Sequence, residues 1–388
     1  MKRYVFIVFV FVLTSGLLMQ STGENRAGQT QKITELHATV VSVDDSGLIH
    51  TGVVPYGPQF VDVTFTDKDW AGQRLSIKNH LMGKADIDTP CQVGDAVIVG
   101  VKIQDNKIMA GKILEHDRTL WLSIMAILFV SLLVGYAGMI GIKSLISFIL
   151  SVWIIWDVLV RGLLEGKEPI FLISWVIVLL SAIIIFSVAG LTRKGVSAFL
   201  GTLLGLGFTV ILTVIFGSGL KVNGMTLPFA EALIFNGNLS LNMREIFYGA
   251  VLLGASGASM DIAMDVAASM EEIKIKKPDI ERKELILSGI KIGRHVIGTM
   301  STTLLLAYSG GFITLLMLFM TKSTKLSHIL NLKIVASEIM RTLIGSTNLI
   351  LVAPLTALIA GWLLCQDQTF ESLYKSKPDA EEMQAENI

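Results

Sequence analysis

Apolar and polar positions alternate in the first third of this chain and give way to long apolar runs after residue 118. Between residues 34 and 117 the alternating runs are short, rich in β-branched residues and separated by Gly, Asp and Asn. This period of two is typical of half-buried strands. The runs are HATVVSV, VDVTFTD, QRLSIKN, DAVIVGVKI and KIMAGKIL. Together they predict a small β-barrel-like domain over residues 34–117.

Short strands of this number are typical of an OB-like barrel, a fold that binds oligonucleotides or sugars in some proteins. Such binding needs basic and aromatic side chains interleaved on one surface. The sequence of residues 34–117 has no such stripe. We therefore expect a structural or interaction domain, with no nucleic acid as a partner.

The runs after residue 118 are long enough to cross a bilayer as helices, since a hydrocarbon core of about 30 Å requires about 20 residues. Charge-free runs occupy residues 120–142, 169–192, 195–220, 296–321 and 342–366. Two further runs, residues 144–160 and 246–270, contain aspartate. The pattern therefore predicts a polytopic α-helical membrane domain over residues 119–366, with about seven spans after the β domain.

The first 30 residues have the layout of a signal peptide or a signal anchor, with Lys2 and Arg3 before an apolar run. Both alternatives stay open, because no clear cleavage pattern follows the apolar run. Either one would place the β domain outside the cytoplasm. We accordingly expect residues 34–117 to be extracytoplasmic.

With the β domain outside, three basic loops fall in the cytoplasm, as the positive-inside rule requires. These loops are residues 139–143, 191–194 and 271–294. The charged tail, residues 367–388, then lies in the cytoplasm as well. Basic residues between positions 322 and 341 fall outside, and a re-entrant break at residues 308–311 would reverse everything after it. We expect a multi-pass protein of the cell membrane with a cytoplasmic C-terminus.

Composition supports this class of protein. Of the 388 residues, 52% are hydrophobic and 16% charged, and the mean hydropathy is +0.64. Basic and acidic residues number 32 each, so net charge indicates no acidic partner. Cys91 and Cys365 fall on opposite sides of the predicted membrane and cannot form a disulfide within one chain. The histidines show no zinc-binding spacing, so we expect neither a metal nor a cofactor.

The segment GASGASMDIAMDVAASM, residues 254–270, places two aspartates inside a predicted span. At helical spacing its small and acidic residues share one face, which comprises Gly254, Gly257, Ala258, Asp261 and Asp265. Small residues allow a neighbouring helix to approach closely. An ionised carboxylate in the membrane interior costs at least about 2.5 kcal/mol. We therefore expect this face to meet protein or a water-filled cavity and not lipid.

Two ionised carboxylates on one face repel each other, and either protonation of one or a bound cation between them would relieve the repulsion. This favours a functional site at Asp261 and Asp265. The alternative is structural: Asp265 lies near the cytoplasmic end and is solvated, and Asp261 pairs with a basic residue.

Three other groups could contribute to the predicted site. The hydroxyls of Thr299 and Thr303 could line a polar path, although such hydroxyls often bond carbonyls of their own helix. Asn348 lies where a proline is expected to kink the last span. Glu338 and Arg341, three residues apart, are expected to form an ion pair on that helix.

Residues 254–272, 293–311 and 338–360, in this order and spacing, resemble the YibE/F family of multi-spanning membrane proteins. The segments HATVVSVD, GQRLSIKNHL and VGDAVIVGVKI of the predicted β domain resemble the same family. The resemblance implies an outside domain followed by a helical membrane domain, and it implies no defined activity. Asp261 fits the pattern expected of the family, whereas Asp265 departs from it.

These observations predict an ion- or proton-coupled transporter or permease, with a binding site drawn from Asp261, Asp265, Thr299, Thr303 and Asn348. The alternative is a non-transporting envelope scaffold or regulatory protein whose β domain recruits a partner. A second membrane subunit or a second copy of the chain is left open as a partner within the lipid bilayer. We do not expect an enzyme, because the sequence offers neither a nucleophile with a base nor a metal cluster.

Overall fold

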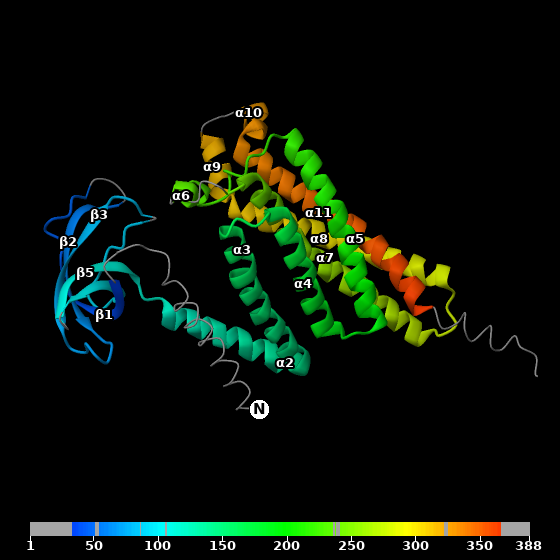
Figure 1. The fold of residues 1–388 in the computed structure, drawn as a ribbon, viewed down its shortest axis with the longest axis horizontal. Helices are drawn as coiled ribbons and strands as arrows, with labels where there is room; N and C mark the ends of the chain where they lie inside the picture. Colours follow the sequence, from blue (N-terminus) through cyan, green and yellow to red (C-terminus); the bar gives the residue numbers. More distant parts are fainter. Residues whose placement is uncertain are drawn as a thin grey trace, which may run out of the picture. The chain divides into compact units, whose positions relative to one another are not determined.

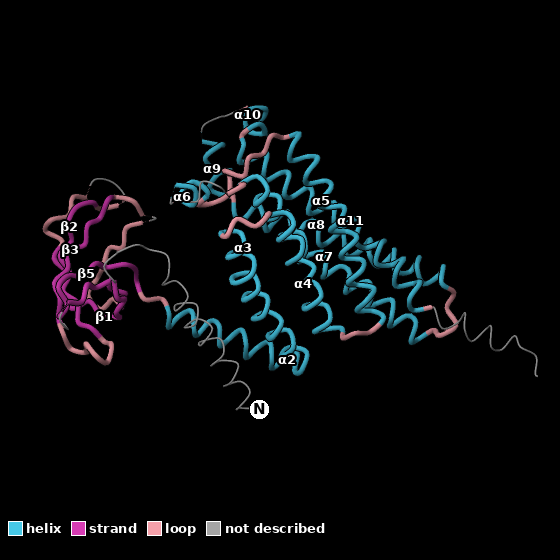
Figure 2. Tube along the Cα trace, in the orientation of Figure 1, coloured by secondary structure: helices cyan, strands magenta, loops and turns pink. Residues whose placement is uncertain are grey.

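The computed structural model describes residues 33–50, 54–85, 87–104, 107–235, 237, 241–321 and 325–365. It divides into two compact units, residues 1–136 and 137–388, which are taken separately below. Figure 2 shows that strands make up one unit and helices the other. The predicted signal segment, residues 1–30, and the predicted tail, residues 367–388, lie outside the described residues.

The first unit contains one antiparallel five-stranded sheet with the strand order β3-β2-β1-β4-β5 (Figure 1). The strands are β1 (Ile33–Asp44), β2 (Tyr56–Phe65), β3 (Arg74–Met82), β4 (Ala96–Gln104) and β5 (Lys107–His116). The edge strands β3 and β5 approach each other at Gly111, where an added Cβ would lie 2.6 Å from Leu75 Cδ2. The predicted small β-barrel-like domain is therefore confirmed, as a nearly closed sheet.

The core of this sheet follows the alternation of the sequence. On β2, Val61, Val63 and Phe65 are buried and the residues between them are not, which is the pattern of a strand with one face in the core. A buried glutamine joins the loops: Gln59 Nε2 donates to Asp45 Oδ1 at 2.8 Å and to the Cys91 carbonyl at 3.0 Å. Burial raises the pKa of the Cys91 thiol to about 11.

The second unit is helical, and the helix α2 crosses the boundary between the two units. Its helices are α2 (Thr119–Trp153), the π-helical turn η1 (Ile154–Val160), α3 (Arg161–Leu164), α4 (Pro169–Ala189), α5 (Arg193–Gly219), α6 (Ala230–Phe235), α7 (Met243–Lys276), α8 (Arg282–Gly311), α9 (Ile313–Thr321), α10 (Leu326–Asn331) and α11 (Lys333–Leu364). In the described residues, five helices are long and apolar enough to cross a membrane, or six if the bent pair α8 and α9 forms one span.

The predicted count of seven spans is higher, because two of the predicted spans belong to one helical run. Residues 120–142 and 144–160 lie within Thr119–Leu164, and the predicted cytoplasmic loop at residues 139–143 is helical. The backbone is not helical at Gly138, which has φ 54° and ψ −126°, so the run consists of two helices that meet at a kink. Glycine adopts this left-handed conformation without the steric penalty of a Cβ. The kink lies within five residues of Lys143, so the division into two segments predicted from the sequence is present as a bend at Gly138.

Near residues 308–311, where a re-entrant break was considered as an alternative, α8 and α9 meet at a bend of 65° at Phe312. It does not reverse the chain. Gly289 of α8 lies beside Ala357 of α11, and Gly293 lies beside Ala353, so the two helices run antiparallel. The chain therefore reaches the opposite end of the bundle between α8 and α10, and α11 then runs back to the end where α8 begins.

Helices α5, α7 and α11 form the centre of the bundle, and α5 and α11 lie side by side in Figure 1. Glycines on α5 set their separation. An added Cβ on Gly201 would lie 3.0 Å from the Cα of Thr356, and one on Gly205 would lie 2.7 Å from Asn348 Oδ1. Gly201 and Gly205 are four residues apart on one face, which is the small-xxx-small pattern of close helix packing.

This packing predicts opposite effects for one substitution at two nearby glycines of α5. Gly205→Ala is expected to destabilise the bundle by about 1–3 kcal/mol, because the methyl group would overlap Val352 and Asn348. Gly207→Ala is the matched control, since nothing lies within 4 Å of its added Cβ, and it should leave stability unchanged or slightly raised. Thermal unfolding of the full-length protein in detergent measures both. Equal melting temperatures for the two variants would contradict the close contact.

The raised pKa of Cys91 predicts slow alkylation. In a full-length Cys365→Ser protein at pH 8, about one Cys91 thiol in a thousand is ionised, since pH 8 lies three units below a pKa of about 11. The rate of labelling with N-ethylmaleimide should rise about ten-fold per pH unit up to pH 10. Denatured protein supplies the control, with an ordinary thiol pKa. A folded-state rate at pH 8 equal to the denatured rate would contradict the burial of this thiol.

Candidate functional site

Helix α7 carries the aspartates and is the most enclosed of the candidate spans, with 61% of its most apolar 18-residue window buried. The Asn242 side chain caps its first turn by accepting from the Glu245 amide at 3.3 Å. Lys274 and Lys276 lie in the last turn, where positive charge is favourable to the helix dipole. Helices α4, α5, α8 and α11 pack against α7. Four neighbours nevertheless leave one face uncovered.

That uncovered face is the α7 stripe, which we define as Gly254, Gly257, Asp261 and Asp265, all exposed. Ala258, predicted to share the face, is half-buried and packs partly against the bundle core. An added Cβ on Gly257 would meet nothing within 4 Å. These residues therefore lie on one face of α7, as predicted. Within the described chain, Gly257 packs against no other helix.

Asp261 and Asp265 have no partner among the residues that the structure describes. Neither carboxylate forms a hydrogen bond there, and no basic side chain of those residues lies within 4.0 Å of either. In the same part of the chain, no cluster of three His, Cys, Asp or Glu side chains is arranged to hold a metal ion. To hold a cation, the two carboxylates would need ligands from outside the described residues.

The hydroxyls of α8 are occupied by their own helix. Thr299 Oγ1 donates to the Val296 carbonyl at 3.0 Å, and Thr303 Oγ1 donates to the Thr299 carbonyl at 3.0 Å. Both threonines are exposed. This arrangement is the structural alternative considered for them above, and it forms no polar path with the aspartates inside the described chain.

Asn348 lies on the opposite side of α7 from the aspartates. It is fully buried on α11, and its Nδ2 donates to Ser259 Oγ of α7. Ser259 Oγ in turn donates to the Ala255 carbonyl at 2.7 Å. Two residues along a helix correspond to a rotation of about 200°, so Ser259 and Asp261 point away from each other. Asn348 and Asp261 therefore do not form one site within a single chain.

Glu338 and Arg341 hold α11 to the first turns of α7. Arg341 Nη1 lies 3.6 Å from Glu338 Oε2, and the guanidinium lies 5.5 Å from the ring centroid of Phe247 on α7. Glu338 Oε1 and Arg341 Nε are buried and have no hydrogen-bond partner among the residues that the structure describes. Phe247 precedes Asp261 by 14 residues, or about 21 Å along the helix. The ion pair is thus too far away to neutralise Asp261.

The buried polar residues between α5, α7 and α11 were missing from the sequence-based site. They include Thr202, Thr209, Ser259 and Thr356, each with a relative exposure of 0%. Thr202 and Thr209 bond carbonyls four residues earlier in α5, at 2.8 Å and 3.0 Å. The small-xxx-small pattern in GTLLG, residues 201–205, was the signal in the sequence that could have identified α5 as their partner helix.

A protein-family model described as YibE/F-like protein matches residues 125–366. The match covers more than half of the chain, so the chain belongs to this family. No curated protein and no solved structure matches the chain. The family membership agrees with the resemblance seen in the sequence and assigns no activity to the stripe.

The buried contact between α7 and α11 predicts a measurable coupling. Ser259→Ala removes the partner of the Asn348 amide and should destabilise the protein, because a buried amide without a partner costs about 1–3 kcal/mol. A double-mutant cycle with Asn348→Ala should give a coupling energy of about 0.6–1.7 kcal/mol in detergent. Ser288→Ala on α8 is the control, since its hydroxyl bonds only the Glu284 carbonyl at 2.9 Å. Additive losses in the cycle would contradict the contact.

Proposed function

We propose that this YibE/F-like membrane protein is an ion- or proton-coupled transporter or permease that works as an assembly, with Asp261 in a polar path along the α7 stripe. The observation that carries the proposal is the pair of exposed carboxylates on a helix otherwise enclosed by its neighbours. Facing lipid, an ionised carboxylate costs at least about 2.5 kcal/mol. An arrangement that covers the stripe with protein or water is therefore favoured.

A path inside a single chain has little support. The hydroxyls of Thr299 and Thr303 are used by α8, and Asn348 is enclosed between α5, α7 and α11. Closely packed glycines leave little room in that interior. We infer that the transport path forms where the stripe meets a second protein surface.

In a second copy of the chain, the exposed face of α8 is complementary in charge to the α7 stripe and lies at the same height in the bundle. Val266 of α7 lies 3.7 Å from the position of an added Cβ on Gly293 of α8, so Asp265 and Arg294 lie at about the same height in the bundle. Lys291 and Arg294 are exposed on α8. Copies inserted in the same orientation keep these heights, so the acidic part of one stripe would face the basic part of the next α8.

In this arrangement Asp261 is the group that takes up and releases a proton or cation, and Asp265 sets the local charge. The small residues Gly254 and Gly257 let the neighbouring helix approach the same face. Uptake from one side and release to the other then requires the two copies to shift relative to each other.

The orientation proposed for the assembly has an extracytoplasmic β domain and a cytoplasmic C-terminus. The turn between α4 and α5, the loop between α7 and α8 and the end of α11 lie at one end of the bundle, where Lys194 Nζ is 2.6 Å from Glu271 Oε2. This end carries most of the basic residues of the helical unit. The positive-inside rule supports a cytoplasmic location for it.

Reconstituted protein tests the proposal. In proteoliposomes under an imposed membrane potential, wild-type protein should conduct protons or Na⁺ into the lumen, and Asp261→Asn should lower the flux to that of empty liposomes. Glu272→Gln, on the same helix but beyond the apolar segment, should keep the wild-type flux. Full flux in the Asp261→Asn protein would contradict the role of this residue. Wild-type protein that conducts neither ion, with a β domain that retains a specific protein, would favour the scaffold alternative.

A further inference from the structure

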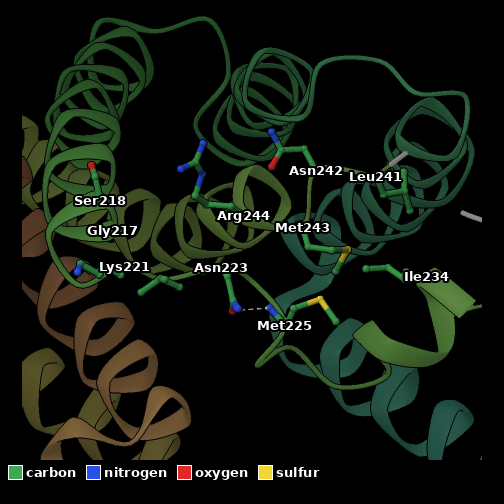
Figure 3. A pocket seen from close by; sticks show the side chains of 11 residues that line it. Gly217, Ser218, Lys221, Asn223, Met225, Ile234, Leu241, Asn242, Met243 and Arg244 are labelled. Atoms are coloured by element: carbon green, nitrogen blue, oxygen red, sulfur yellow. Dashed lines mark hydrogen bonds between the residues drawn. The ribbon is translucent and has the colours of Figure 1, made fainter. Parts of the chain in front are cut away.

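A second polar feature of the helical unit is a cavity of about 560 Å³ at the end of the bundle remote from the α7–α8 loop. It lies between the C-terminal end of α5, the loop that follows, α6 and the first turn of α7 (Figure 3). Its charged lining residues are Lys221 and Arg244, and Ser218, Asn223 and Asn242 supply neutral polar groups. No carboxylate is among the lining residues, so the cavity has a net positive lining.

The positive charges of Lys221 and Arg244 are not neutralised by any side chain of the described residues. Neither Lys221 nor Arg244 forms an ion pair with any residue that the structure describes. The neighbouring acid, Glu245, accepts instead from Asn242 Nδ2 at 2.6 Å. Arg341, close to the same end of the bundle, is paired with Glu338. The positive charge of the lining therefore remains available to a ligand.

Lys221 adopts a backbone conformation that is unfavourable for any residue other than glycine. The amide of Val222 donates to the Gly217 carbonyl at 3.0 Å, and the amide of Lys221 donates to the Ser218 carbonyl at 3.1 Å. This is a Schellman end of helix α5, with Lys221 at φ +53° in the position that glycine usually occupies. A lysine there is unfavourable for the backbone. A ligand for its ammonium group would offset that cost.

The length of α5 leads us to expect the cavity at the depth of the lipid headgroups. Helix α5 has 27 residues and is about 40 Å long, which exceeds the hydrocarbon core of about 30 Å. The residues that follow α5 therefore reach the interface. Phe229 directly precedes the short helix α6, and Phe235 is its last residue; they are 86% and 80% exposed, as is typical of aromatic side chains at a membrane surface. Ile234 of the same helix lines the cavity.

We propose that this cavity binds a phosphate group through Lys221 and Arg244, carried by an anionic lipid headgroup or by a soluble phosphate. Guanidinium and ammonium groups bind phosphate by charge-assisted hydrogen bonds, and the side-chain amide nitrogen of Asn223, whose oxygen accepts from the Met225 amide, can donate one more. The exposed aromatic side chains beside it favour the lipid as the source. The site is independent of the α7 stripe and of transport.

Lipid retention by the full-length protein tests the site. Delipidated protein in detergent is mixed with phosphatidylglycerol or phosphatidylcholine, and bound lipid is counted by native mass spectrometry. Wild-type protein should retain phosphatidylglycerol in preference to phosphatidylcholine. Lys221→Gly and Arg244→Gln should each lower that retention about five-fold. Lys221→Gly should also fold at least as well as the wild type, because glycine suits the left-handed backbone.

The control variant and a second probe separate the outcomes. Lys325→Gln removes an exposed positive charge that precedes α10 and is not part of the cavity, and it should retain lipid as the wild type does. Inorganic phosphate, titrated without lipid, identifies a soluble source if it stabilises the wild type and neither cavity variant. The site is overturned if both cavity variants retain phosphatidylglycerol and respond to phosphate as the wild type does. An equal loss in Lys325→Gln would also overturn it.

Discussion

The absence of water in the bilayer core is the constraint on which the rest of this structure depends, because each polar group on a membrane helix must then be met by protein. Helices α5, α7 and α11 meet the requirement for part of their inner faces, while Thr213 Oγ1, Asn348 Oδ1 and Thr356 Oγ1 are buried without a hydrogen-bond partner among the described residues. Gly201 and Gly205 bring α11 close, and hydroxyls such as that of Ser259 bond both their own helix and Asn348. The α7 stripe is the exception, since its carboxylates lie outside this packing. These uncovered carboxylates are the reason for inferring that a partner surface covers the stripe.

The two ends of the helical bundle differ in whether their charged side chains are paired. One end joins Lys194 to Glu271 and contains the turn and loop that connect the central helices. The other end holds the pair of Glu338 and Arg341 and the cavity whose two cations form no ion pair with any described residue. Paired charges fix helices to one another, whereas unpaired charges at a membrane surface are available to ligands. The same comparison distinguishes Arg341, held by an acid and an aromatic ring, from Arg244.

Much of the fold could be predicted from the sequence, because alternation and long apolar runs report directly on strands and spans. The exact number of spans could not, since apolar length does not reveal that the two apolar runs before residue 164 are joined by a kink at Gly138 and not by a loop at Lys143. Helical spacing correctly grouped Gly254, Gly257, Asp261 and Asp265 on one face. It could not tell whether that face meets this chain or another, because small-residue patterns suit either kind of partner. Lys221 was missed, since its role depends on a left-handed backbone that the sequence does not display.

The central claim is that a second copy covers the α7 stripe with its α8, and cysteine cross-linking between copies tests it most directly. Two differently tagged chains without Cys91 and Cys365 are co-expressed, one carrying Gly257→Cys and the other Thr302→Cys. Antiparallel packing of α7 and α8 places these two positions at about the same height in the bundle. The account predicts a disulfide between the two tags in native membranes under mild oxidation. Chains that both remain monomeric, with each cysteine still open to alkylation, would contradict it.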